Sequence, residues 1–131
     1  MQLAILTAST AIIFLALDAI MITTVMRPLF AAHLGESLLP GLRLAPAVLF
    51  YLIYVAGMIY LVSYPALKTA TPVLIPAVVL GLMAYGSDEL TSYSVMKAWH
   101  PAMVLADMAW GALLTGFAAW AGVQITRAFA P

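Results

Sequence analysis

The stretch PAVLFYLIYVAGMIYLVSY, residues 46–64, is apolar around every side of the chain. A strand of a membrane β-barrel would instead alternate apolar and polar side chains over segments of about ten residues. The length of this stretch matches the roughly 20 residues that a helix needs to cross the hydrocarbon core of a bilayer. The stretch therefore predicts a transmembrane helix and argues against β structure.

Three further segments repeat this apolar pattern. They cover residues of about 3–26, 72–86 and 101–125. Prolines, which can begin or stop a helix, stand at the segment ends: Pro28, Pro40, Pro65, Pro72 and Pro101. No linker long enough to divide domains interrupts the chain. We therefore predict an all-α, polytopic membrane protein, a four-transmembrane-helix bundle that forms a single domain over residues 1–131.

The composition supports this class. Of the 131 residues, 66% are hydrophobic and 8% are charged, whereas soluble domains carry about 25% charged residues. Five basic and five acidic residues leave no excess charge to attract nucleic acid, so no nucleic-acid partner is expected. The chain has no cysteine, which excludes disulfides and thiolate sites. The first segment lacks the basic start of a signal peptide and is interpreted as a retained span.

The third apolar segment is too short to cross a membrane alone. Its fifteen residues, 72–86, would extend roughly 22 Å as a helix, against a hydrocarbon core of roughly 30 Å. The polar stretch SDELTSYSVMK, residues 87–97, is therefore expected to continue the span in helical or broken-helical form against the other helices. The alternative is a short span around which the bilayer thins.

Small residues recur at helical spacing in the fourth segment. The pairs are Gly111 and Thr115, Ala112 and Gly116, and Ala118 and Gly122. This spacing allows helix backbones to approach closely. We expect this face to pack inside the bundle in preference to forming a dimer interface.

Two acidic residues lie inside predicted spans. Asp18 and Asp107 each cost about 2.5–3.5 kcal/mol at such a depth, and residues of this kind usually face the bundle interior. Both lie toward the span ends that meet the first and third loops, so they share a leaflet with Asp88 and Glu89. We expect Asp18 and Asp107 to line one cavity between neighbouring first and fourth spans, with Glu89 closing its mouth.

Other polar residues on the same side each have two interpretations. Tyr51 is either a hydrogen-bond partner of the acids or an interfacial aromatic residue, and His100 is either a ligand-binding residue or an interfacial one. Lys97 is the only basic residue between the third and fourth spans and is predicted to pair with Glu89 or Asp107. The non-functional alternative for Lys97 is a solvated ion pair worth about 0–1 kcal/mol. No local ligand motif such as HExxH is present, so no metal site is predicted.

Three blocks carry a family resemblance: PAVLFYLIYVAGMIYLVSYPAL (46–67), GLMAYGSDELTSYSVMKAW (81–99) and LADMAWGALLTG (105–116). The chain resembles the DUF2177 family of small bacterial predicted membrane proteins over nearly its whole length. The likeness implies a multi-pass protein of the bacterial cytoplasmic (inner) membrane and carries no activity over. It places these residues on motif positions: Asp18, Glu89, Leu90, Thr91, Lys97, Asp107, Trp110 and Gly111.

The chain departs from the family pattern at four positions. Met21 stands where the family tends to have Trp, Asp88 where it has Tyr, Glu89 where it has Asp, and Ser92 where it has Asn. A glutamate keeps the charge but reaches further, and the loss of an asparagine amide removes a two-way hydrogen-bonding group. The resemblance therefore implies that this member has an altered site.

The leading functional hypothesis is an acid-lined intramembrane pocket that binds or moves a cation, a proton, or a small polar or lipid-headgroup ligand. The candidate binding residues are Asp18, Tyr51, Glu89, Thr91, Lys97, His100, Asp107 and Trp110. The alternatives are an accessory or structural subunit of a larger membrane complex and a lipid-modifying enzyme with Asp107 or Glu89 as general base. Binding is favoured over catalysis, and the sequence leaves any cofactor unknown. The expected partner is the lipid bilayer, with a homo-oligomer or a larger membrane complex left open.

Overall fold

The computed structural model describes residues 1–35 and 43–131, and all the regular structure in these ranges is helical. The all-α prediction is therefore confirmed. The elements are α1 (Gln2–Met21), η1 (Ile22–Met26), α2 (Arg27–Leu34), α3 (Leu44–Met58), η3 (Ile59–Ser63), α4 (Tyr64–Thr69), α5 (Leu74–Val95) and α6 (Pro101–Phe129). Because η1 and η3 are π-helical turns that join their neighbours without a break, the described residues form four helical rods.

Three of the described rods are long and apolar enough to cross a membrane, namely Gln2–Leu34, Ala45–Thr69 and Pro101–Phe129. The fourth rod, α5, has 22 residues, but its C-terminal part carries Asp88 and Glu89. Large apolar side chains cover the outside of the bundle, including Ile12, Leu52, Ile53, Leu105 and Leu113. A surface that is apolar on this scale is expected for a bundle immersed in lipid.

Two prolines that were expected at segment ends lie inside continuous rods. Pro28 follows η1 and Pro65 follows η3, so the first rod runs on to Leu34 and the second to Thr69. A proline has no N–H to bond to the carbonyl four residues earlier, and its ring crowds that carbonyl. In both rods a π turn precedes the proline and widens the helix there. The proline-break expectation was wrong at these two positions for this reason.

The remaining expected helix boundaries have different outcomes. Pro101 begins α6 as expected, and His100 caps that helix by accepting the N–H of Ala102 on its Nδ1 at 3.0 Å. Pro72 precedes α5. Pro40 lies outside the described residues. The polar stretch after residue 86 continues α5 as regular helix up to Val95.

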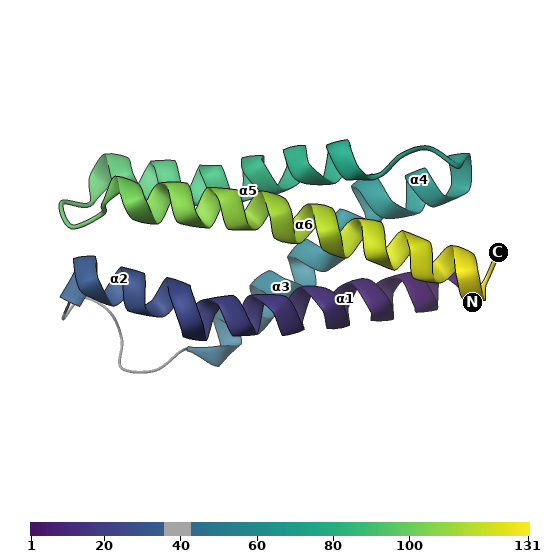
Figure 1. The fold of residues 1–131 in the computed structure, drawn as a ribbon, viewed down its shortest axis with the longest axis horizontal. Helices are drawn as coiled ribbons and strands as arrows, with labels where there is room; N and C mark the ends of the chain where they lie inside the picture. The colour runs from purple at the N-terminus through teal and green to yellow at the C-terminus, as the bar shows by residue number, and fades with distance from the viewer. Residues whose placement is uncertain (36–42) are drawn as a thin grey trace.

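The rods form an elongated bundle in which α6 occupies the centre (Figure 1). Helices α5 and α1 each pack along α6, and the rod of α3 and α4 crosses behind them. The two termini meet at one end, where the Gln2 side chain donates to the Ala130 carbonyl at 2.7 Å and Lys68 donates to Gln2 at 2.8 Å. At the opposite end α2 lies near the turn between α5 and α6.

Close backbone packing between α5 and α6 holds the centre of the bundle. A Cβ atom added to Gly81 would lie 2.5 Å from the carbonyl oxygen of Gly111. The small residues of the fourth segment are buried: Gly111, Ala112, Thr115, Gly116, Ala118 and Gly122. The expectation that they pack inside this bundle is confirmed. About three turns further along α6, Gly122 packs against Thr10 of α1, whose hydroxyl oxygen would lie 2.1 Å from a Cβ added there.

Candidate functional site

Asp18 on the first rod forms hydrogen bonds with residues of two other rods. Its side chain on α1 is only 6% exposed. One carboxylate oxygen accepts the indole N–H of Trp110 on α6 at 3.0 Å, and the other accepts the hydroxyl of Tyr51 on α3. Hydrogen bonds to a charged acceptor are stronger than neutral ones. Of the two interpretations of Tyr51, the structure therefore favours the hydrogen-bond partner of a buried acid.

A second group of acids joins α5 to α6. Carboxylate oxygens of Asp88, Glu89 and Asp107 all lie within 4.8 Å of one another, and the carboxyl groups of Glu89 and Asp107 are within hydrogen-bonding reach. Glu89 is buried, with 1% of its surface exposed, and accepts the indole N–H of Trp99 at 2.9 Å. Carboxyl groups this close need a shared proton or a cation between them. These three acids are also the residues that could hold a metal ion.

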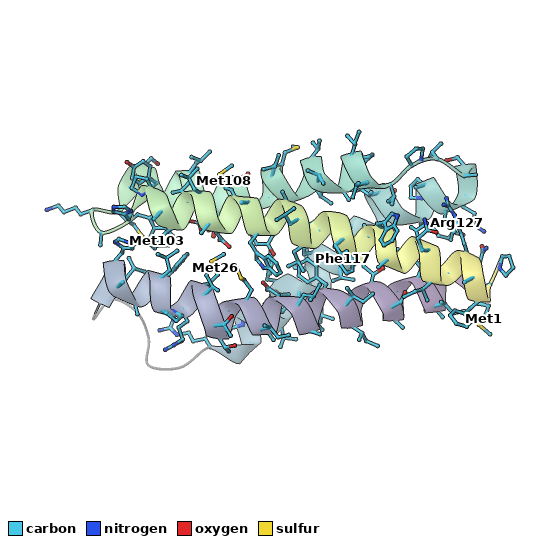
Figure 2. The ribbon with its side chains drawn as sticks, in the orientation of Figure 1. Met1, Met26, Met103, Met108, Phe117 and Arg127 are labelled. Carbon is cyan, nitrogen blue, oxygen red and sulfur yellow. The ribbon has the colours of Figure 1, made fainter. Side chains whose placement is uncertain are left out.

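Asp18 and Asp107 line the same cavity, which has a volume of about 300 Å³. Its walls are Asp18, Ile22, Met26, Arg27, Phe30, Phe50, Tyr51, Tyr85 and Asp107. In Figure 2 the side chain of Met26 lies between the ribbon of the first rod, to which it belongs, and that of α6. The shared cavity and the contact of α1 with α6 agree with the expectation that Asp18 and Asp107 lie at the same depth and line one cavity. Glu89 is buried and its carboxylate lies within 4.8 Å of that of Asp107, but Glu89 is not among the residues that line this cavity.

A second cavity, of about 380 Å³, adjoins the first. It shares Phe50, Tyr85 and Asp107 with the first cavity and adds Ala84 and Asp88. Asp107 thus borders both spaces, whereas Asp18 and Arg27 border only the first.

Tyr85 was missed by the sequence reasoning. Its ring occupies the space beside Gly111, where an added Cβ would lie 2.2 Å from the ring. Its hydroxyl oxygen is buried and has no hydrogen-bond partner among the described residues. The available signal was the glycine directly after Trp110, because a glycine in a helix interior needs a reason such as close packing.

Thr91, Lys97 and His100, which were predicted as site residues, do not line the cavity. Lys97 is exposed in the turn after α5 and makes no ion pair with the described acids. The prediction that Lys97 pairs with Glu89 or Asp107 was therefore wrong, because the Trp99 indole occupies the position beside Glu89. Thr91 borders a separate groove, together with Met83 and Met108.

His100 serves as a helix cap and contacts another histidine. Its ring stacks on that of His33 with 4.1 Å between the centroids and 15° between the planes. Next to this pair, Phe30 meets Trp99 edge-to-face at 5.4 Å. Since Phe30 also lines the first cavity, these contacts close the end of the bundle beside that cavity. Sequence reasoning found His100 but missed the contacts of Trp99.

Replacing Trp99 by phenylalanine should lower the free energy of unfolding by about 1–3 kcal/mol, because the buried Glu89 carboxylate loses its N–H donor. Lys97→Met is the matched control from the same turn and should change the free energy by less than about 0.5 kcal/mol. Unfolding in mixed detergent micelles, followed by circular dichroism, measures both values. A larger effect of the Lys97 change would restore that lysine as the partner of the acids.

Helices with apolar outer faces are typical of a helical membrane protein, and this one has a cavity lined by acids in one half of its bundle. A family model described as "Predicted membrane protein (DUF2177)" matches residues 3–124. The chain belongs to the DUF2177 family, and the resemblance seen in the sequence is confirmed. No curated protein and no solved structure matches the chain significantly.

Proposed function

We propose that the protein crosses the bacterial inner membrane four times, with α5 as a span in addition to the three long apolar rods. With 22 residues, α5 extends about 33 Å, which is enough for a hydrocarbon core of roughly 30 Å. It packs along α6, a helix that is itself long and apolar enough to span. The acids near its end then lie at the membrane surface or just inside it.

The protein, in this proposal, binds or moves a cation or a proton at Asp107. The observation that carries the proposal is the position of Asp107 between a cavity shared with Asp18 and the two acids of α5. Asp18 already accepts hydrogen bonds from two donors, whereas in the group of Asp88, Glu89 and Asp107 the Trp99 indole donates to Glu89. Acids in a membrane span are costly and rare, and they usually mark the path of an ion, a proton or a substrate.

Asp107→Asn tests this proposal, because it keeps the shape of the side chain and removes its charge. The purified protein, reconstituted in lipid nanodiscs, is expected to be stabilised thermally by at least one cation from a panel of alkali, alkaline-earth and ammonium salts at matched ionic strength. The Asn variant should lose that stabilisation at every salt. Thr91→Ala, outside the cavity, is the control and should respond like the wild type. A wild-type response from the Asn variant would exclude Asp107 as the binding group.

An accessory role in a larger membrane complex is the second candidate. One observation favours it: an apolar groove of about 380 Å³ on the outer face of α5 and α6, lined by Leu74, Val78, Leu113, Gly116, Phe117 and Trp120. Grooves with a small residue at their base suit a neighbouring transmembrane helix. A protein with this role would be retained with a partner subunit in native mass spectrometry, and its behaviour would not depend on Asp107.

A further inference from the structure

The walls around Asp107 are mainly aromatic. Phe50 and Tyr85 border both cavities together with Asp107, and their rings meet at 84° with 6.4 Å between centroids. Tyr51 continues this wall, 5.7 Å from Phe50, and Phe30 adds a fourth ring to the first cavity. Asp107 therefore borders aromatic rings in both cavities, and its carboxylate also lies within 4.8 Å of those of Asp88 and Glu89.

This environment is a poor one for a bare metal ion inside the cavity. Ca²⁺ takes about 6–8 oxygen ligands, and Mg²⁺ gives up its water reluctantly. Each oxygen of Asp18 already accepts one hydrogen bond, from Tyr51 or from Trp110, and Asp107 is the other carboxylate that lines the first cavity. The rest of the wall is mostly carbon. Asp88 and Glu89 do not line the first cavity, so an inorganic cation inside it would lose its hydration without enough replacement ligands.

A substituted ammonium group has the opposite requirements. It is attracted to the faces of aromatic rings within about 6 Å, by about 0.5–2 kcal/mol depending on desolvation, and one carboxylate satisfies its charge. A cavity of about 300 Å³ lies at the lower end of the volumes that hold small ligands, roughly 300–1,000 Å³. Arg27 carries a positive charge, which would repel a cation, and it borders the first cavity but not the second. A cation can therefore bind near Asp107 beside Phe50 and Tyr85, which border both cavities.

We infer that this cavity binds an organic ammonium group, held by the carboxylate of Asp107 and the rings of Phe50 and Tyr85, an inference that rests on the proposed cation site. The ammonium group can belong to a lipid headgroup or to a soluble amine, because the recognising chemistry is the same. Inorganic ions bind more weakly in this cavity.

Phe50 offers a clean test, because it is 44% exposed and its replacement leaves no hole in the core. The protein in phosphatidylglycerol nanodiscs is titrated with tetramethylammonium, potassium and calcium chlorides at matched ionic strength, and binding is followed by thermal stability. Tetramethylammonium should bind roughly tenfold more tightly than potassium. Phe50→Leu should weaken tetramethylammonium binding about fivefold and Phe50→Trp should preserve or strengthen it. Phe117→Leu is the control, at an aromatic residue of the outer groove.

The outcomes separate this inference from the function on which it rests. If calcium or potassium binds more tightly than tetramethylammonium, or if Phe50→Leu has no more effect than Phe117→Leu, the ammonium inference is overturned while a cation site that requires Asp107 still stands. If no salt binds and Asp107→Asn changes nothing, both fail. Repeating the titration in phosphatidylethanolamine nanodiscs identifies the source of the group. Weaker tetramethylammonium binding there assigns it to the lipid headgroup, and unchanged binding assigns it to a soluble amine.

Discussion

Gly81→Ala is expected to destabilise the bundle by about 3 kcal/mol, at the upper end of the range for overpacked cores. The added methyl group would lie 2.5 Å from the carbonyl oxygen of Gly111 and 2.9 Å from the Cα of Ala112. Both atoms belong to the backbone of α6, so no side-chain rotation can relieve the clash. Helices α5 and α6 would have to separate, and the shared cavity wall at Tyr85 would move with α5.

Gly57→Ala provides the matched control for this prediction. Gly57 also lies inside a helix, but a Cβ there would meet no atom within 4 Å. Alanine is the better helix former by about 1 kcal/mol, so this variant should be neutral or more stable. Denaturation of both variants in mixed detergent micelles gives the comparison. Equal stability of the two would mean that α5 and α6 are not in backbone contact.

The second large effect is expected at Asp18. Tyr51→Phe and Trp110→Phe each remove one donor from its buried carboxylate and should each cost about 1–3 kcal/mol. The double variant leaves a buried charge with neither donor and should cost about 3–5 kcal/mol. Adding Asp18→Leu to the double variant removes that charge, so we expect much of the stability to return.

This recovery distinguishes loss of hydrogen bonds from loss of packing. If the double variant is destabilised only because the rings have changed, replacement of Asp18 will not restore it. Tyr60→Phe is the control for removal of a tyrosine hydroxyl, since Tyr60 is 78% exposed. The free energies of the single, double and triple variants, measured under one set of conditions, give the coupling energy directly.

Properties that follow from apolar length and from the cost of burying charge could be predicted from the sequence. The helical class, the inward face of small residues on α6 and the shared cavity of Asp18 and Asp107 all rest on such arguments. The extent of the first rod could not be predicted, because the rule that proline ends a helix is local. The π turn that accommodates Pro28 forms within the packed bundle.

The site was less predictable where one residue type has several uses. Tyr85 lies in an apolar run, where a tyrosine is usually an interfacial anchor, and only its packing on Gly111 shows that it belongs to the cavity. Lys97 was preferred as the partner of Glu89 because of its charge. The turn between α5 and α6 places an uncharged donor, the Trp99 indole, beside that acid instead, and neither composition nor spacing encodes the direction of such a turn.

The π turn η1 also sets the phase of the first rod along the cavity. Asp18, Ile22, Met26 and Phe30 are spaced four residues apart, and all four line the same space. In an unbroken α-helix the twelve residues from Asp18 to Phe30 would rotate the later side chain about 120° away from the earlier one. A π turn, closed here by the bond from the Arg27 N–H to the Ile22 carbonyl, uses more residues per revolution and reverses part of that rotation. The local helix pitch therefore determines how many residues of the first rod line the cavity. Inserting or deleting one residue within Ile22–Met26 would rotate Arg27 and Phe30 away from the cavity together, while Asp18 kept its position.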